Sequence, residues 1–265
     1  MTKIIEVKKI SQNIVLLTMS NKEINNNVSW DAVKQLSNAL ENARQSGSNI
    51  AILASGLKDH WFEHAWLTDL LAPYEDRETT APAKHWFRLL NELTHPDLIT
   101  IAAINGRTSG GGAEIGWACD FRIAEKKARF VQPEVDLNIT TGIGGTSRVA
   151  RLIGPVNTAE LVMLGNEFTS KKMFKLGAIN KVVDNGDSLN SAIEFAKELS
   201  KKPKDALSLL KKILIESQEM PLSQALENEQ KLFQTIVGTE NAIKKMQGVQ
   251  KEYNDGKKPE DIKYQ

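Results

Sequence analysis

Residues 98–114 read LITIAAINGRTSGGGAE, and this stretch decides which fold we expect. The apolar run Leu98–Ile104 is typical of a buried strand, and Gly110–Gly112 give a bare backbone that another group can approach closely. We expect a helix to begin at Ala113, with Glu114 in its first turn beside N–H groups that favour a developing oxyanion. The stretch therefore predicts a strand, a glycine loop and a helix that begins next to a carboxylate.

Strands and helices alternate through the first half of the chain. The expected elements are, in chain order, a strand over 14–19, a helix opened by Ser29, a turn at 47–49, a strand over 50–54, a helix over 83–93 and a strand over 121–124. Residues 57–82 hold Trp61, Phe62 and Trp66 and are expected to form a loop and a short helix. This alternation with short links predicts an α/β layered fold with parallel strands.

The second half of the chain reads as mainly helical. From Thr158 onward we expect consecutive amphipathic helices, over 189–199, 206–214 and 222–233, with a strand only at 177–183. The tail, residues 254–265, is polar and rich in lysine, so we expect a solvated, frayed end.

Composition bounds the classes of function that we expect. Lys and Arg number 34 against 33 Asp and Glu, so the net charge of +1 points neither to nucleic acid nor to an anionic membrane. The single cysteine, Cys119, excludes an intramolecular disulfide, fits a reducing cytoplasm and is expected to be a buried structural thiol. The amino end lacks a signal-peptide core and no apolar run approaches about 18 residues. We therefore expect a soluble cytoplasmic protein.

A second carboxylate accompanies Glu114. Glu134 follows Gln132-Pro133 and precedes the glycine-rich run 142–146, so each glutamate lies close to a sharply marked turn. Alone, Glu114 would be read as a charge that complements a helix dipole, and Glu134 as an ordinary loop carboxylate. Two such carboxylates together suit paired acid and base work on one small substrate.

Other glycine-rich and metal motifs do not fit. Residues 106–111 lack the lysine and hydroxyl of a phosphate loop, residues 142–145 do not complete the dinucleotide-binding pattern, and no nucleophile elbow is present. The four histidines show no pairing typical of a metal site, so we expect no metal.

The ordered combination of motifs resembles the enoyl-CoA hydratase/isomerase (crotonase) superfamily. The pieces that carry the resemblance are residues 102–106, 110–114, 119–120, 128–130, 132–134, 142–146, 152–154, 159–161 and 177–183, with weaker similarity at 26–29 and 61–67. The resemblance implies an α/β crotonase-like β-β-α superhelical (spiral) core over residues 1–195. It also implies a helical C-terminal trimerisation region over residues 196–265, and hence a homotrimer or homohexamer.

The resemblance also implies a chemistry. An acyl-CoA thioester would be the substrate, with no separate cofactor, and its carbonyl oxygen would be held by the N–H groups of Ala65 and Gly111. By match, Glu134 is the principal acid for the α-carbon, Glu114 activates the water, and the Gly142 N–H helps to hold that water. Relatives that only shift a double bond typically keep the carboxylate at the position of Glu134 and lose the other, so both together favour a hydratase.

Substrate-binding residues implied by the resemblance are Asn27, Val28, His64, Trp66 and Leu67. Three of them depart from the family pattern: Asn27 replaces a small residue, His64 a glycine and Trp66 an aspartate. Asn138 and Thr141 similarly stand where glycine and proline are frequent. We expect residues 61–82 to form much of the acyl pocket's wall, with the acyl group itself left open.

Several functions stay open beside the hydratase. An enoyl-CoA isomerase or another crotonase-type lyase is one, on a fatty-acid intermediate or on a biosynthetic, carrier-protein-linked acyl group. An RNA-binding relative and an inactive scaffold are others. The dense lysine clusters, at 201–204, 211–212 and 257–258, lack interleaved aromatics and are typical of solvated faces, and a scaffold would be expected to have lost a glutamate.

Overall fold

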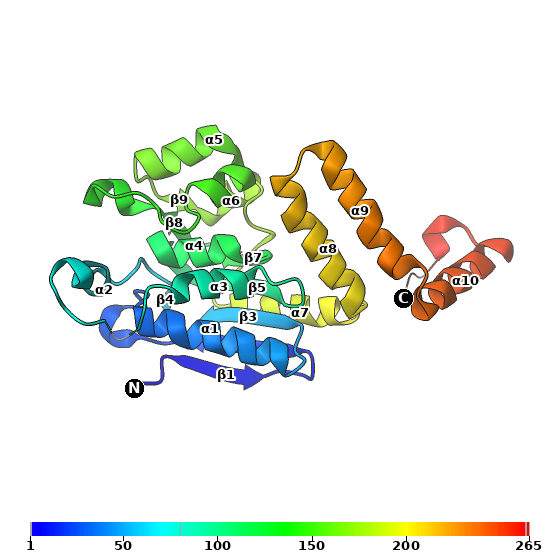
Figure 1. Ribbon diagram of the computed structural model, residues 1–265, viewed down its shortest axis with the longest axis horizontal. Coiled ribbons are helices and arrows are strands. Elements are labelled where there is room, and N and C mark those ends of the chain that lie inside the picture. The colour runs from blue at the N-terminus through cyan, green and yellow to red at the C-terminus, as the bar shows by residue number, and fades with distance from the viewer. Residues whose placement is uncertain (1, 80, 263, 265) are drawn as a thin grey trace. The chain divides into compact units, whose positions relative to one another are not determined.

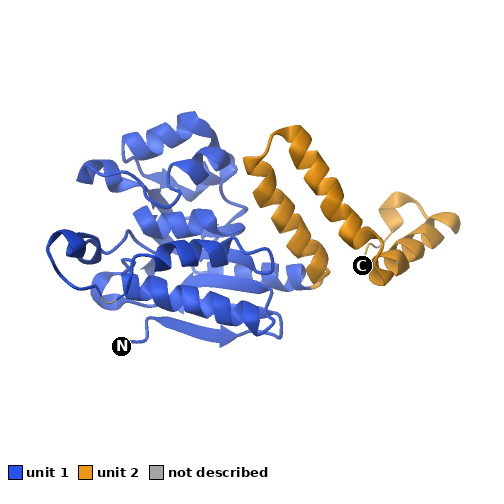
Figure 2. Ribbon diagram, in the orientation of Figure 1, with its two compact units in different colours: residues 1–200 blue, residues 201–265 orange. Residues whose placement is uncertain are grey.

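The computed structural model describes residues 2–79, 81–262 and 264. The chain divides into two compact units, Met1–Ser200 and Lys201–Gln265 (Figures 1 and 2). Within the described residues, the strands all belong to the first unit and the second unit is helical.

A six-stranded sheet forms the centre of the first unit. Its order is β1 (Ile5–Lys9), β2 (Ile14–Met19), β3 (Ile50–Ser55), β5 (Ile99–Ile104), β7 (Phe121–Glu125) and β10 (Lys181–Val183). All neighbours are parallel except β1, which is antiparallel to β2. Every residue of β5 is buried, which explains its unbroken apolar run, since a parallel strand is covered on both faces. The predicted parallel α/β arrangement is confirmed.

Helices form where the periodicity predicted them. Helix α1 (Trp30–Gln45) begins at Ser29, whose side chain accepts the Ala32 N–H at 3.2 Å, as a helix-capping serine does. Helix α3 (His85–Leu93) runs beside α1 in Figure 1 and contacts it along its length. Helix α7 (Ser188–Ser200) packs against β3, β5 and β7.

A second, smaller sheet was not predicted. Its order is β4 (Asp59–His60), β6 (Gly106–Ser109), β8 (Arg129–Val131) and β9 (Phe168–Thr169), with β9 antiparallel to β8. Strands of two to four residues are too short to show an alternating pattern, so the sequence gives no signal for them. The region 57–82 also holds the expected short helix, α2 (Leu67–Leu71), followed by the 3-10 turn Ala72–Tyr74.

The predicted glycine loop is wrong in one respect. Residues 106–109 form strand β6, and helix α4 (Gly110–Ala118) begins at the first glycine of the triplet, so Glu114 lies in the second turn and not the first. The reason is tertiary packing, because a Cβ on Gly112 would lie only 2.2 Å from the carbonyl oxygen of Glu63. The glycines are helical, and they let α4 approach the chain segment around residue 63.

The predictions for residues 147–183 need two further corrections. Helix α5 (Ser147–Met163) begins well before Thr158. It is interrupted at Gly154, which has a non-helical φ of 76° and is followed by Pro155. Helix α6 (Ser170–Lys175) follows, and the predicted strand over 177–183 is confined to β10, because Gly177 adopts a left-handed φ of 86°. Cys119 is buried at the end of α4, as expected.

The second unit consists of helices α8 (Lys204–Glu216), α9 (Leu222–Val237) and α10 (Glu240–Asn254). The first two were predicted and α10 was not. In the tail, Pro259–Asp261 form a 3-10 turn, while residues 263 and 265 lie outside the described residues. Across the described part of the chain, every helix is too short or too polar to cross a bilayer.

Candidate active site

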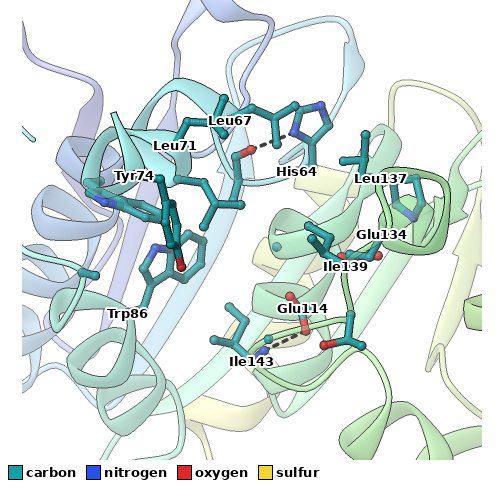
Figure 3. Close-up of a pocket in the computed structure, with 18 of the residues that line it drawn as sticks. His64, Leu67, Leu71, Tyr74, Trp86, Glu114, Glu134, Leu137, Ile139 and Ile143 are labelled. Carbon is teal, nitrogen blue, oxygen red and sulfur yellow. Dashed lines mark hydrogen bonds between the residues drawn. The ribbon is translucent and has the colours of Figure 1, made fainter. Parts of the chain in front are cut away.

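A cavity of about 560 Å³ opens in the first unit between α2, α3, the start of α4 and the segment 133–143. Figure 3 shows Glu114 and Glu134 on one side of it and Leu71, Tyr74 and Trp86 on the other. The lining residues are Trp30, His64, Ala65, Leu67, Leu70, Leu71, Tyr74, Ala83, Trp86, Phe87, Gly111, Glu114, Pro133, Glu134, Leu137, Ile139, Thr140, Gly142 and Ile143. The structure therefore gathers both glutamates, both expected N–H donors and Gly142 around one space.

Glu114 is held firmly in this cavity. Its side chain is 2% exposed, and its Oε1 accepts the N–H groups of Ile143 at 2.9 Å and Gly145 at 2.6 Å. Burial raises the pKa of Glu114, while the backbone N–H groups of residues 142–145 act in the opposite direction by favouring the carboxylate. The glycine-rich run thus provides an anchored, oriented carboxylate.

Glu134 is in a different environment. It lies just after Pro133 in the 3-10 turn Pro133–Leu137, and its Oε2 is buried without a hydrogen-bond partner among the described residues. Burial raises the pKa of Glu134 to about 7, its own backbone N–H opposes that shift, and the nearby charge of Glu114 adds to it. Near neutral pH, Glu134 is therefore poised between its acid and its base form.

The N–H groups of Ala65 and Gly111 come from two different segments of the chain and lie close together. A Cβ placed on Gly111 would stand 3.3 Å from the nitrogen of Ala65. The Gly111 N–H belongs to the first turn of α4, where no intrahelical acceptor exists. Ala65 forms a parallel β-bridge with Val28. Its two hydrogen bonds involve the residues on either side of Ala65: the Val28 N–H donates to His64 O, and the Trp66 N–H donates to Val28 O, each at 2.9 Å. In such a bridge the central residue turns its own N–H away from the partner strand.

Glycine is required at position 110, where the two segments meet, and position 111 leaves little room for a side chain. Gly110 has a φ of +44°, and a Cβ there would lie 2.8 Å from His64 Cβ and 3.1 Å from Glu134 Oε1. A Cβ on Gly111 would also stand 3.3 Å from Cη2 of Trp86. A side chain at either position would separate the N–H donors, Glu134 and the apolar wall from one another.

The expected substrate-binding residues divide into two groups. His64 and Leu67 line the cavity, and the His64 Nδ1 is 2.8 Å from the carbonyl oxygen of Ala65. Asn27, Val28 and Trp66 do not line it. The Asn27 amide donates to Ile24 O at 2.7 Å, Val28 is buried in the bridge to Ala65, and Trp66 precedes α2. A role for these three in binding substrate stays a prediction.

Sequence reasoning missed several residues of the apolar wall. Trp86 stands edge-on to Trp30, with ring centroids 5.6 Å apart, and both line the cavity. Phe87 on α3, and Leu137 and Ile139 after Glu134, complete the wall. Their apolar character was visible in the sequence, but nothing in it distinguished residues that face a cavity from residues that fill a core. Trp61 and Phe62, by contrast, are fully buried and stacked on each other with centroids 4.0 Å apart.

Comparison with known proteins agrees with this geometry. The family model described as "Enoyl-CoA hydratase/isomerase" matches residues 9–259. The chain is 30% identical to crotonyl-CoA hydratase of Syntrophomonas wolfei, over 87% of this chain and 88% of that protein. It is 31% identical to 2,3-dehydroadipyl-CoA hydratase of Escherichia coli, over 87% and 89% of the two chains.

Solved structures share the fold. The crystal structure of enoyl-CoA hydratase from Bacillus anthracis superposes with a TM-score of 0.83, covering 94% of this chain and 97% of that one at 24% identity. A structure from Geobacillus kaustophilus gives a TM-score of 0.84 at 22% identity and covers 99% of both chains. These likenesses confirm the predicted crotonase-type fold.

Proposed function

Since the chain belongs to the enoyl-CoA hydratase/isomerase family, we propose that it is an acyl-CoA hydratase. Such a lyase adds water to an α,β-unsaturated acyl thioester, or removes it. The observation that carries the proposal is the pairing of Glu114 and Glu134 in one cavity, beside two adjacent backbone N–H groups. The coenzyme A thioester is proposed as substrate, and the chemistry described below calls on no resident cofactor or metal.

The proposed reaction begins at the thioester carbonyl. The N–H groups of Ala65 and Gly111 donate to its oxygen and stabilise the negative charge that develops there, an effect worth about 3–4 kcal/mol for one such donor. The α4 helix start contributes its dipole in the same direction. Polarisation of the carbonyl makes the β-carbon of the conjugated double bond electrophilic.

Water then adds through the two glutamates. Ionised Glu114, with the Gly142 N–H, orients the water and takes its proton while the oxygen bonds to the β-carbon. The electron pair of the double bond moves to the thioester oxygen and forms an enolate. Protonated Glu134 then donates its proton to the α-carbon, and exchange with solvent returns both carboxyl groups to their starting states.

The environments of the two carboxyl groups support these roles. Burial raises the pKa of Glu114, but the backbone N–H groups that donate to its Oε1 act against this shift and favour the charged form that a base needs. The raised pKa of about 7 leaves Glu134 substantially protonated at neutral pH, as an acid requires. The different surroundings of the two carboxyl groups thus favour a base at Glu114 and an acid at Glu134.

The cavity wall favours an apolar acyl chain. Figure 3 shows Leu71, Tyr74 and Trp86 on the side opposite the glutamates. Leu70 and Phe87 also line the cavity, and none of the described lining residues is a lysine or arginine. A terminal carboxylate would enter this space without a cationic partner and close to two acidic groups, which is unfavourable. We therefore propose a monocarboxylic acyl chain longer than crotonyl, in contrast to the dicarboxylic substrate named for the E. coli relative.

Kinetics with a panel of thioesters tests the proposed function. Trans-2-enoyl-CoA substrates from four to twelve carbons should lose the absorbance of the conjugated double bond in the presence of the protein. Each added methylene that enters the apolar wall should raise kcat/KM about 4-fold. Turnover of 3-enoyl-CoA without hydration would replace the hydratase by an isomerase. Activity only on carrier-protein thioesters would keep the chemistry and change the substrate carrier.

The helical second unit supports the proposed self-association. Leu210, Leu214, Leu222, Leu226 and Phe233 on α8 and α9 are all exposed. Such a run of exposed apolar side chains is typical of a surface that a partner covers. A homotrimer or homohexamer is the proposed assembly, in a reducing, cytoplasmic setting, and a monomer in sedimentation at micromolar concentration would contradict it.

A further inference from the structure

We infer that Glu63 is a positioning residue, whose buried carboxylate holds the Ala65 N–H in register with the Gly111 N–H. The inference rests on the proposed function, because it assigns these N–H groups to the thioester oxygen. Glu63 lies outside the cavity lining and touches no part of the space that a substrate would occupy. Its effect on the reaction would be exerted through the segment 62–66, which is called the oxyanion loop below.

Three donors surround the Glu63 carboxylate, which is 4% exposed as a residue. Its Oε1 lies 2.8 Å from Nδ1 of His60, and its Oε2 accepts from Nη1 of Arg107 at 2.5 Å and from Oγ of Ser109 at 2.6 Å. All three donors belong to the small sheet, at β4 and β6. The carboxylate therefore ties the oxyanion loop to strand β6, directly before helix α4.

Ser109 transmits this contact to the backbone of the oxyanion loop. Because its hydroxyl proton is donated to Glu63, its lone pairs face the His64 N–H, which lies 3.1 Å from Oγ. Ser109 is also the residue that precedes the first turn of α4, which supplies the Gly111 N–H. One hydroxyl thus links the two chain segments that carry the N–H donors.

The next peptide group fixes the direction of the Ala65 N–H. The carbonyl of His64 accepts the Val28 N–H at 2.9 Å. In a planar trans peptide, this carbonyl and the N–H of Ala65 point in opposite directions, so the Ala65 N–H points away from Val28. Val28 holds the oxyanion loop from one side, and the contacts of Glu63 and Ser109 hold it from the other.

Replacement of Glu63 by glutamine should disturb this arrangement. A glutamine has a single acceptor oxygen and an NH₂ group, whereas the site presents three donors to two carboxylate oxygens. If the NH₂ group takes the place of Oε2, Ser109 and Arg107 face a donor and must reorient; if it takes the place of Oε1, His60 can accept from it through Nδ1, and Ser109 and Arg107 keep an acceptor that has lost its charge. In either orientation the bond that fixes the Ser109 hydroxyl is broken or weakened.

A matched control is available on α3. Glu92 is also buried, at 7% exposure, and is paired with Arg44 through two contacts of 2.9 Å. It does not line the cavity. Glu92→Gln therefore removes a buried glutamate–arginine pair of similar kind without touching the oxyanion loop. Any general cost of neutralising such a pair appears in both variants.

The experiment compares Glu63→Gln, Ser109→Ala and Glu92→Gln with the parent protein. It measures kcat, KM, thermal unfolding and the carbonyl stretching band of a bound, non-hydratable enoyl-CoA analogue. We expect Glu63→Gln and Ser109→Ala to lower kcat by about 10- to 100-fold, with KM changed only a few-fold. In both, the carbonyl band should move back toward its position in free solution. Glu92→Gln should lower the unfolding temperature and leave both readouts unchanged.

The possible results separate the inference from the proposed function. Unchanged kcat and an unchanged carbonyl band in folded Glu63→Gln and Ser109→Ala would overturn the positioning role. If Glu63→Gln does not fold, Ser109→Ala decides, because it leaves the Glu63–Arg107 pair intact. If the parent protein shows no hydration, the proposed function fails, while the band of the bound analogue still reports whether Glu63 orients the N–H donors.

Discussion

Gly111→Ala is the sharpest test of the paired N–H donors. The added methyl group would stand 3.3 Å from both Ala65 N and Trp86 Cη2. The optimal separation between non-bonded carbon atoms is about 3.5–4.0 Å, so α4 and the oxyanion loop must move apart by a few tenths of an ångström. The methyl group would also occupy space beside the thioester oxygen.

The expected loss in Gly111→Ala follows from donor geometry. Removing one such donor costs about 100- to 1,000-fold in kcat, and a displacement near 1 Å costs about 100-fold. We therefore expect kcat for trans-2-enoyl-CoA hydration to fall by about 100-fold. Stability should change little, because alanine is favoured over glycine in a helix by about 1 kcal/mol, which offsets part of the steric cost.

Gly116→Ala is the matched control for this prediction. Gly116 lies on the same helix, and a Cβ there would meet Cζ3 of Trp61 at a comparable 3.2 Å, but it does not line the cavity. Hydration rates and denaturant unfolding should be measured on both variants. Equal kcat values in Gly111→Ala and Gly116→Ala would refute the assignment of the Gly111 N–H to the substrate oxygen.

Four further predictions concern the carboxylates and the apolar wall. Glu114→Gln and Glu134→Gln should each lower hydration by about 100-fold or more with the fold retained, as judged by circular dichroism, and full activity of Glu114→Gln would favour an isomerase. Because burial raises the pKa of Glu134 to about 7, hydration kcat/KM should fall as pH rises through that value, and this limb should vanish in Glu134→Gln. The folded state binds the Glu134 proton more tightly than the unfolded chain does. The contribution of this group to the free energy of unfolding should therefore fall as pH rises from about 4.5 to 7. Denaturant titrations of the parent protein and Glu134→Gln over this pH range check the sign. Trp86→Ala should reduce kcat/KM for long acyl chains far more than for crotonyl. Trp66→Ala tests the predicted binding role of Trp66: a changed chain-length profile in a folded variant would support that role, and lower thermal stability with an unchanged profile would contradict it.

The sequence predicted the large sheet better than the small one, for a physical reason. Buried parallel strands such as Ile50–Ser55 require an unbroken apolar run, which is visible in any single sequence. Strand Asp59–His60 has two polar residues and exists only because β6 pairs with it. The prediction of a loop at the glycine triplet, residues 110–112, was wrong for a similar reason. Its helical form depends on packing against the Glu63 segment, and tertiary contacts overrode the low helix propensity of glycine.

The candidate site shows the same division between local and tertiary information. The family motifs brought Glu114, Glu134, Ala65 and Gly111 to attention, and the structure brings all four to one cavity. What the motifs do not contain is the difference between the carboxyl groups. Oε2 of Glu134 is without a hydrogen-bond partner among the described residues because elements distant in the sequence bury it. For the same reason the role of Glu63 had no signal in the sequence, since its three donors are assembled by the small sheet.

One glycine couples the two carboxylates. The Gly145 N–H donates to Glu114 Oε1 at 2.6 Å, which anchors the proposed base. A Cβ on the same residue would lie 1.9 Å from Nε2 of Gln132, so a side chain at position 145 would force the buried side chain of Gln132, two residues before Glu134, to move. Gly145 therefore anchors the proposed base through its N–H and, by lacking a side chain, leaves room beside the segment that carries the proposed acid. This dual constraint gives a physical reason for glycine at position 145.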